Sequence, residues 1–469
     1  MSISGEDYIY ANSEQHYPPT SSITGTIALL IGLFLSYSLL SNAGSPSTIA
    51  KTTATTVGIA LASSIYFDSR RGLRNLFRTD LLCLIGLYFL TLAEFLFPQS
   101  EFDELLTLSQ TNQALVVVLV GLGGVTIGRH LIKPKPVQSN WLKFGDISNK
   151  TLFHGVIVAA FLGYLYMLLS VNFNIVTMVD AMLGARFSQP WTRSRLGDWT
   201  TFITELNLLL YLIPPLTGVI WNRRQFFTLF QLLIILIIFG FTLFYGFSGG
   251  TRNIFIAYLA TFITGYLITL RQNNFRNTIL PILITAFIAV YGSYHMLEFR
   301  TMGLRNYIQN QVYDEDTVRE TLAVDYNLFS LGLLVDAFPQ KHDYVGFEIL
   351  SWALLKPVPR VLWPGKPQGL SVSIEEVVGA DGWTVSATYL GEAYMMGGLV
   401  GTIGVSLFLG AIAAWWNRMA MQRQSDYAMV IYALGFFVAG ITMRSMFWLT
   451  TMMLPIVALI VVKKSGLIR

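Results

Sequence analysis

Stretches of mainly apolar residues recur along the whole chain, each of about the 20 residues that a helix needs to cross a membrane. We identify twelve of them, at residues 23–41, 48–67, 80–97, 113–132, 151–171, 199–220, 226–247, 252–270, 278–297, 386–416, 427–444 and 446–462. The second is the weakest, because it is rich in Thr and Ser and carries Lys51. The pattern predicts an all-α polytopic membrane protein with about 12 transmembrane helices.

Charged residues are too scarce for a soluble protein of this size. Asp, Glu, Lys and Arg make up 12% of the 469 residues, whereas soluble domains carry roughly 25%. The one cysteine, Cys83, lies within an apolar stretch, which excludes a disulfide framework and Cys-based metal sites. The sequence has no basic segment with interleaved aromatic residues, so nucleic acid is not expected as a partner.

The placement of Lys and Arg predicts the orientation, because cytoplasmic loops are enriched in these residues. Eighteen of the 31 fall in alternate loops or in the C-terminal tail, and the short loops between them carry almost none. We therefore expect cytoplasmic tails at 1–22 and 463–469. The first nine spans are expected within 23–297, and the last three within 386–462.

Most of the remaining basic residues lie in two outer segments, 172–198 and 298–385. The second is far longer than an ordinary connection, and such long loops are usually functional. Within it, 317–338 carries apolar residues at helical spacing, namely Leu322, Tyr326, Phe329, Leu333 and Phe338. We therefore expect 298–385 to form a large, partly helical cap, and the outer face to carry the function.

The outer turn Ser248-Gly249-Gly250-Thr251-Arg252-Asn253 is one candidate binding site. Thr251 is placed to cap the next helix, and two glycines permit close approach to its backbone amides. With Arg252 on the first turn, these features suit an anion. The alternative is a tight hairpin whose Arg252 reaches toward lipid headgroups.

A second candidate is the loop from Lys356 to Pro367, where four prolines exclude a regular helix. This rigidity holds Arg360 and Lys366 in place as possible phosphate ligands. Trp363 offers a flat face for a sugar ring. The alternative is a basic loop that rests on anionic lipid.

Other outer charges follow the ninth span. Glu298, Arg300 and Arg305 lie where this span reaches the outer surface; they could act at a site or pair with one another. Arg186 is a further outer cation in the segment 172–198.

Three glutamates, Glu94, Glu205 and Glu392, fall inside predicted spans. A charge at membrane depth is costly, which makes each a functional candidate, although each could instead lie near an interface or bond to its neighbours. The outer histidines, His295 and His342, and the scattered carboxylates show no metal-ligand spacing. We expect no metal or other cofactor.

Several of these segments together resemble the Wzy-type O-antigen and exopolysaccharide polymerases, which join oligosaccharide repeat units. The resemblance covers about residues 185–400. It rests on the Gly250-Thr251-Arg252 turn, the Phe299-Arg300 pair, the Pro359-Arg360…Trp363-Pro364-x-Lys366-Pro367 segment and the run from Ser386 to Gly398. The Pro-Arg…Trp-Pro segment is its most specific part, and the N-terminal spans match in hydropathy alone.

The resemblance implies a C-type glycosyltransferase of the bacterial inner membrane whose active site faces the periplasm. Such an enzyme transfers a growing glycan from undecaprenyl pyrophosphate to a hydroxyl of an incoming lipid-linked repeat unit. Its expected partners are these lipid-linked oligosaccharides, as donor and acceptor, and the membrane lipids. A chain-length regulator and a flippase are possible protein partners.

The same resemblance assigns roles to the candidate residues. The pyrophosphate is expected to bind Arg186, Arg252, Arg300, Arg305, Arg360 and Lys366. The carboxylate that acts on the acceptor hydroxyl is expected among Glu298, Asp325 and Asp336. Sugar contacts are expected from Trp363, Tyr389 and Glu392.

Two other functions share parts of this pattern. An O-antigen ligase would use the same pyrophosphate chemistry but would transfer finished polymer to another acceptor. A polysaccharide or lipid transporter commonly has 12 spans. Major-facilitator-type transporters, however, join two six-helix halves through a long cytoplasmic loop, whereas here the sixth and seventh spans are joined by Trp221 to Gln225.

Overall fold

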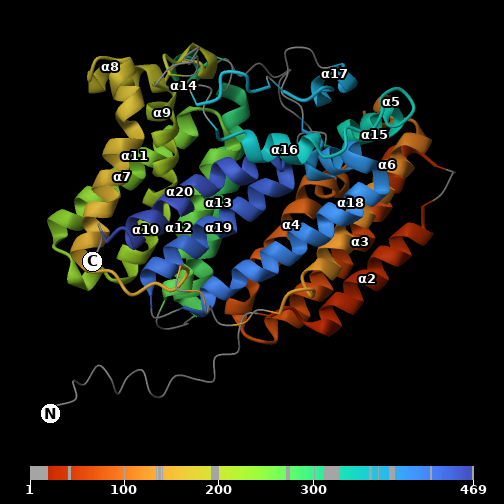
Figure 1. The fold of residues 1–469 in the computed structure, drawn as a ribbon, viewed down its shortest axis with the longest axis horizontal. Coiled ribbons are helices and arrows are strands. Elements are labelled where there is room, and N and C mark those ends of the chain that lie inside the picture. The colour runs from red at the N-terminus through yellow and green to blue at the C-terminus, as the bar shows by residue number, and fades with distance from the viewer. Residues whose placement is uncertain are drawn as a thin grey trace.

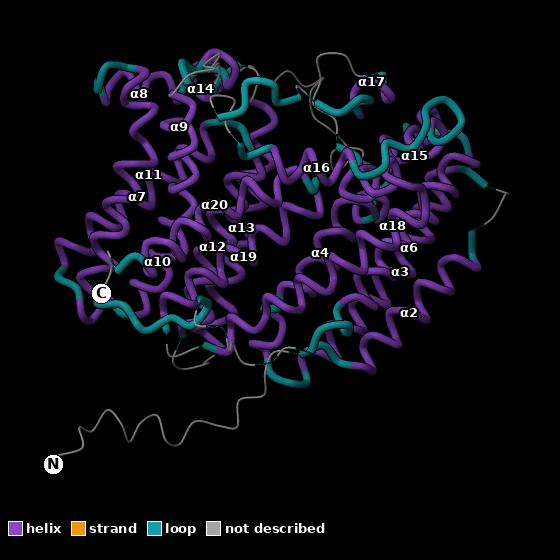
Figure 2. Tube along the Cα trace, viewed as in Figure 1, coloured by secondary structure: helices purple, strands orange, loops and turns teal. Residues whose placement is uncertain are grey.

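The computed structural model describes residues 20–40, 44–99, 101–133, 135, 139, 141–191, 200–270, 275–299, 302–310, 327–358, 362–367, 369–379, 386–422 and 425–466. Within these ranges every regular element is a helix, and no strand occurs (Figure 2). The predicted all-α class is therefore confirmed.

In the described ranges, nine segments are helical, long and apolar enough to cross a membrane. They are α6 (Leu108–Gly128), α7 (Asn149–Ser170), Ile203–Asn222, α11 (Leu229–Ser248), α12 (Arg252–Thr269), Arg276–Met296 within α13 (Phe275–Phe299), Thr388–Met421, α19 (Asp426–Arg444) and α20 (Phe447–Lys464). The segment Ile203–Asn222 combines the end of α9 (Thr200–Glu205) with η4 (Leu206–Leu212) and α10 (Ile213–Asn222). Thr388–Met421 combines α18 (Thr388–Trp416) with η7 (Asn417–Met421).

The other three predicted spans are also helical but do not meet the same criteria. α2 (Ile23–Ser38) and α4 (Thr79–Thr91) are shorter, and α3 (Pro46–Ser69) is long but less apolar. A helical membrane protein is thus supported by the structure, and the count of twelve spans stays a prediction.

The helices begin where the sequence supplies side-chain caps. Thr107 before α6 and Thr228 before α11 each form a reciprocal capping box, with Gln110 and Gln231 respectively. Each box satisfies two backbone N–H groups that the start of a helix leaves without a partner. Ser148 caps α7 by accepting a hydrogen bond from the Thr151 amide.

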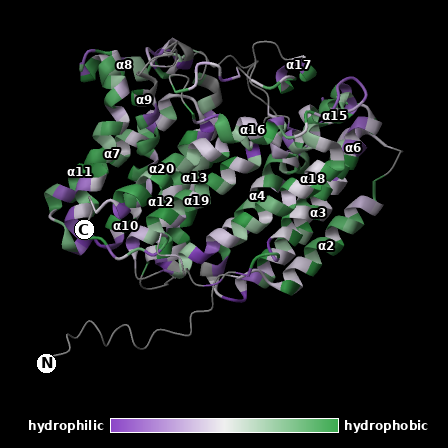
Figure 3. Cartoon of the chain, viewed as in Figure 1, coloured by the Kyte–Doolittle hydropathy of each residue, from purple (hydrophilic) through white to green (hydrophobic). Residues whose placement is uncertain are grey.

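Apart from α13, which packs on α12 and α14 (Leu304–Asn310), the long helices form two bundles with separate cores (Figure 1). The first core contains α2, α3, α4, α6 and α18. The second contains α7, η4, α10, α11, α12 and α19, with α20 against it. α19 also packs on α4 and so joins the two bundles, and Figure 3 shows that the helices of both are largely hydrophobic along their lengths.

The loops that are rich in Lys and Arg meet at one end of the molecule, which we call the basic end. Arg223 donates to Asp146 at 2.9 Å and also pairs with Asp426. Gln422 Nε2 donates to the Leu142 carbonyl at 2.8 Å, and Lys464 Nζ to the Lys143 carbonyl at 3.2 Å. These contacts place the predicted cytoplasmic loops together.

The opposite end, which we call the cap end, carries short helices (top of Figure 1). They are α5 (Phe102–Leu105), α8 (Ile175–Met182), α14 (Leu304–Asn310), α15 (Asn327–Ala337), α16 (Glu348–Leu355) and α17 (Ile374–Val378). The remaining short elements are 3-10 turns, η1 (Leu73–Leu76), η2 (Ala93–Leu96), η3 (Arg186–Ser188) and η5 (Arg224–Phe226). α15 supplies the second half of the helix expected over 317–338, and 311–326 lie outside the described residues.

Buried charges tie the helices together at the basic end. Arg78 Nη2 lies 2.8 Å from Asp68 and 3.1 Å from Asp80, and the three side chains are almost fully buried. Asn417 Nδ2 donates to Asp80 at 2.5 Å, and the Thr79 amide donates back to Asn417 at 2.9 Å. The network therefore links α3, α4 and η7.

Candidate functional site

Two lysines lie at the cap end, on either side of the proline-rich loop that follows α16. Lys356 comes directly after α16, and its Nζ atom lies 4.2 Å from the centroid of the Trp448 ring and 5.7 Å from that of Phe447. Both rings belong to the first turn of α20. An ammonium above an aromatic face is stabilised by the negative charge density of the ring, so α20 positions Lys356.

Lys366 turns back toward the start of the same loop. Its Nζ donates to the carbonyls of Lys356 at 2.7 Å and Val358 at 2.9 Å, and lies 5.4 Å from the Trp352 ring centroid. An ammonium has three donors, so two of them brace the loop. Lys366 therefore shapes the loop that carries Lys356, besides adding positive charge.

Glu392, in the second turn of α18, lies beside the turn that joins α19 to α20. Its side chain is buried, and its two oxygens accept hydrogen bonds from the Ser445 hydroxyl and from the Met446 amide at 2.6 Å. Met446 immediately precedes α20. The carboxylate therefore fixes the start of the helix that carries Trp448.

A further bond ties this turn to α16. The Thr450 hydroxyl donates to the Ala353 carbonyl, three residues before Lys356. The helices α16, α18 and α20 are thus held together by the hydrogen bonds of Thr450 and Glu392 and by the contact between the Lys356 ammonium and the Trp448 ring.

The charges in this region act on one another. Burial and the neighbouring Lys366 lower the pKa of Lys356, while the negative charge of Glu392 opposes this shift. Lys366 in turn interacts electrostatically with Glu205, at the end of α9. We call the set Lys356, Lys366, Glu205 and Glu392, with Trp352 and Trp448, the lysine–glutamate cluster.

This arrangement can bind an anion. Lys356 is half-buried, so its ammonium is partly stripped of water, which strengthens its attraction for a phosphate. The surrounding tryptophans present flat apolar surfaces next to the charge. A ligand that joins an anionic group to a ring or to an apolar chain matches these properties.

Four of the predicted site residues fall outside the described part of the structure, either wholly or in their side chains. Arg300, Asp325 and Arg360 lie outside the described residues. Glu298 belongs to the last turn of α13, and its side chain lies outside the described part.

Two other predicted residues form ion pairs at the surface of the cap end. Arg305 of α14 pairs with Asp180 of α8, and Asp336 of α15 pairs with Lys341 at 2.9 Å. Both pairs are partly exposed, and pairs of this kind stabilise a fold only weakly. Either residue keeps enough exposed surface to meet a ligand.

Arg186 and Arg252 lie among the helices of the second bundle. Arg252 begins α12 and is half-buried; Thr251 occupies the capping position, but its hydroxyl donates to the Gly249 carbonyl instead of capping the helix. Arg186, in η3, acts electrostatically on Tyr245 of α11.

The predicted sugar contacts differ in accessibility. Trp363 is 37% exposed. Tyr389 has no exposed surface, and its hydroxyl lies 3.0 Å from Ser406 Oγ in the same helix. A sugar could reach Tyr389 only if the surrounding helices moved, and Glu392 already accepts two hydrogen bonds.

Sequence reasoning did not single out Lys356 or Trp448. Lys356 lies in the proline-rich stretch that was singled out, but its sequence gives no sign of the aromatic ring 92 positions away that stacks on it. Among the described residues, no three His, Cys, Asp or Glu side chains gather closely enough to hold a metal ion. The expected independence from metals stays a prediction.

A family model described as a domain of unknown function (DUF8712) matches residues 326–464. The match includes α15 to α20 and all of the lysine–glutamate cluster except Glu205. The comparisons with curated proteins and with solved structures found no match.

Proposed function

We propose that the protein is a membrane glycosyltransferase that polymerises oligosaccharide repeat units carried on undecaprenyl pyrophosphate. The observation that supports this proposal most directly is the lysine–glutamate cluster, in which Lys356 is held against Trp448 beside a buried carboxylate. In a chain with few charges, such a cluster at the ends of apolar helices suits a substrate that joins phosphate, sugar and lipid.

In the proposed reaction, the bond between the anomeric carbon of the donor glycan and its pyrophosphate oxygen breaks. An oxygen of the acceptor repeat unit forms the new bond to that carbon. The acceptor proton passes to a carboxylate, and the lipid pyrophosphate leaves with the bonding electron pair. The donor bond is already activated, so no nucleotide is consumed.

Lys356 stabilises the negative charge that develops on the leaving pyrophosphate. Further cations are proposed to stabilise the same negative charge, namely Arg186, Arg252, Arg300, Arg305, Arg360 and Lys366. Glu298, Asp325 and Asp336 remain candidates for the carboxylate that takes the proton, and Glu205 joins them because it interacts electrostatically with Lys366.

The proposal places the protein in a bacterial inner membrane, with both termini in the cytoplasm and the cap end facing the periplasm. The clustering of the basic loops at the opposite end supports this orientation. A chain-length regulator and a flippase would be its protein partners.

The test is to incubate purified protein with a synthetic repeat unit on undecaprenyl pyrophosphate and to separate the products on a gel. A ladder of products supports the polymerase, and Lys356→Ala should slow its formation about a hundredfold, roughly the effect of one lost transition-state contact. Lys150→Ala, at the basic end, serves as the matched control and should leave the ladder unchanged.

Other results would overturn the proposal. A single addition to a different acceptor would indicate a ligase. Absence of any product from correctly folded protein, together with movement of the lipid across vesicles, would indicate a transporter.

A further inference from the structure

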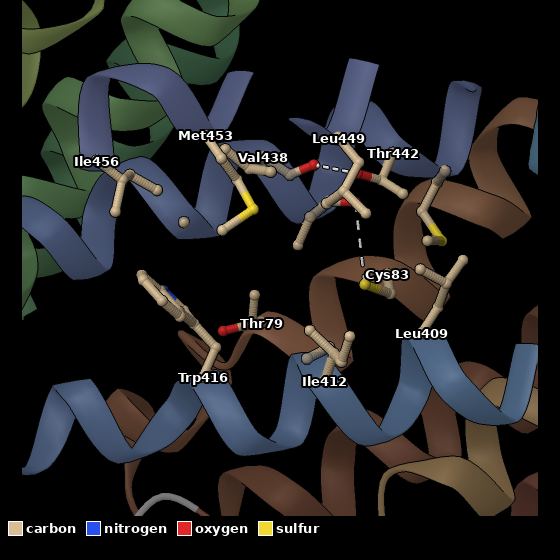
Figure 4. A pocket seen from close by; sticks show the side chains of 14 residues that line it. Thr79, Cys83, Leu409, Ile412, Trp416, Val438, Thr442, Leu449, Met453 and Ile456 are labelled. Carbon is tan, nitrogen blue, oxygen red and sulfur yellow. Dashed lines mark hydrogen bonds between the residues drawn. The ribbon is translucent and has the colours of Figure 1, made fainter. Parts of the chain in front are cut away.

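An apolar groove runs between α18 and α20 (Figure 4). α19 and the start of α4 form its floor, and α18 and α20 form its two walls. The empty space along the groove is about 490 Å³ when the part open to the outside is counted. In Figure 4, Trp416 and Ile412 on α18 face Met453 and Leu449 on α20 across the opening.

Small residues in the floor and walls keep the groove open. Gly435 and Ala439 lie on α19, and Ala413 lies on α18. At one end the Trp416 ring packs directly on Gly435, where a methyl group would meet ring atoms within 2.0 Å. The indole Nε1 donates to the Tyr432 carbonyl at 3.3 Å, which fixes this end of the groove.

The groove opens sideways, toward the surroundings of the helices. Ile412, in one wall, is 36% exposed, and Leu449 and Met453, in the other wall, are partly exposed. Since these helices are apolar along their lengths, the opening faces the hydrocarbon of a membrane. A lipid chain can therefore enter from the side.

The groove reaches the ends of α19 and α20 that also contact the lysine–glutamate cluster. Met443 and Leu449 line the groove, and the residues between them are those that build the cluster. The Met446 amide donates a hydrogen bond to Glu392, and the Lys356 ammonium lies over the Trp448 ring. The hairpin of α19 and α20 thus contributes both to the apolar groove and to the contacts that hold the Lys356 ammonium.

We propose that the groove holds the hydrocarbon chain of a lipid whose phosphate-bearing head binds at Lys356. The identity of this lipid as the polyisoprenyl pyrophosphate substrate rests on the proposed function. Along α19, the lining runs from Gly435 to Met443, about 12 Å of helix. The groove therefore takes the part of the chain nearest the head and leaves the rest in the membrane.

Blocking the groove tests this proposal. The Ala439→Phe variant places a ring on the floor, whereas Ala286→Phe places the same ring on the exposed face of α13. Binding of undecaprenyl pyrophosphate to the full-length protein in detergent is measured for both variants, beside inorganic pyrophosphate. Ala439→Phe should weaken lipid binding roughly tenfold, within the range that overpacking costs, and should leave inorganic pyrophosphate binding unchanged.

Three results would overturn the inference. Lipid binding by Ala439→Phe at the wild-type affinity would show that the chain lies elsewhere. Equal weakening of inorganic pyrophosphate would show that the substitution disturbs the cluster instead of blocking the groove. Equal competition by phosphatidylglycerol would identify the groove as a site for ordinary membrane lipid.

A labelling experiment provides a second readout that does not depend on the larger side chain. In a Cys83→Ala background, Ile412→Cys gives one thiol in the groove wall, and Ala286→Cys gives one on α13. Undecaprenyl pyrophosphate should slow the reaction of the groove thiol with an apolar maleimide, and inorganic pyrophosphate should not. Equal rates with and without the lipid would contradict the proposal.

These measurements separate the inference from the proposed function. If the protein makes no polymer but Ala439→Phe weakens lipid binding, the polymerase proposal fails and the lipid site stands. If the protein makes polymer and Ala439→Phe leaves the KM for the lipid-linked substrate unchanged, the groove proposal fails alone.

Discussion

Replacing Glu392 by Gln removes one negative charge and leaves the shape of the side chain nearly unchanged. The wild-type carboxylate accepts hydrogen bonds from the Ser445 hydroxyl and the Met446 amide. The Gln oxygen can accept from Met446, while its amino group donates to Ser445, whose hydroxyl can turn to accept. Both bonds survive, but neither is then made to a charged group.

The expected cost follows from these two bonds. Hydrogen bonds to charged groups contribute about 1.5–3 kcal/mol each and neutral ones about 0.5–1.5 kcal/mol, so the Gln variant should lose about 2 kcal/mol of stability. Glu392→Ala leaves the buried Met446 amide without this partner, which adds the cost of an unsatisfied donor, about 1–3 kcal/mol. Thermal unfolding in detergent should therefore rank wild type above Gln and Gln above Ala.

Activity distinguishes a positioning role from a chemical one. If Glu392 acts by fixing the start of α20 and hence Lys356, the Gln variant should raise the KM for the lipid-linked substrate and largely keep kcat. Asp, one methylene shorter, cannot reach both donors and should fall below Gln. A Gln variant that keeps its unfolding temperature but loses kcat would refute this reasoning, because the charge itself would then act on the reaction.

Three further predictions concern other parts of the molecule. Because burial and Lys366 lower the pKa of Lys356 below the 10.5 of an ordinary lysine, its positive charge is lost at a lower pH; pyrophosphate affinity should therefore fall as the pH rises toward 10.5, and Lys356→Arg should remove this fall. Arg78→Ala leaves Asp68 and Asp80 buried without their main countercharge, which should destabilise the fold by about 3–5 kcal/mol in thermal unfolding, whereas the exposed Lys150→Ala should have no effect. Gly398 has a φ of 61°, and a Cβ there would lie 2.6 Å from the Tyr344 hydroxyl; Gly398→Ala should cost about 1–3 kcal/mol, and adding Tyr344→Phe should recover part of that loss, unless backbone strain alone sets the cost.

The apolar stretches predicted the helices well, because the length needed to cross a membrane is set by the bilayer and leaves a strong local pattern. The last two spans, predicted at 427–444 and 446–462, are separate helices, since α19 ends at Arg444 and α20 begins at Phe447. α2, α3 and α4 are helices as expected, yet two of them are short and the third is less apolar. Burial inside a bundle permits such helices, so hydropathy alone cannot decide whether they cross the membrane.

The candidate site was only partly predictable, because its geometry depends on contacts between distant segments. Lys366 was expected to bind pyrophosphate through its charge, but the loop folds so that its ammonium also holds the carbonyls of Lys356 and Val358. Glu392 was expected to meet sugar, yet its oxygens hold a turn more than 50 positions later in the chain. The residue types predicted which charges could take part in a site. The packing of α16, α18 and α20 determines what each of these charges contacts.

α18 explains why the cation and the groove can serve one ligand. Its first turns carry Glu392, which fixes the start of α20, and its later turns carry Leu409, Ile412 and Trp416, which form a groove wall. Between them the helix is broken at Gly397 and Gly398, and the Met395 carbonyl accepts a bond from the Val345 amide at 2.9 Å. The non-helical backbone at these two glycines thus separates the half of α18 that bonds to Ser445 and Met446 from the half that lines the groove.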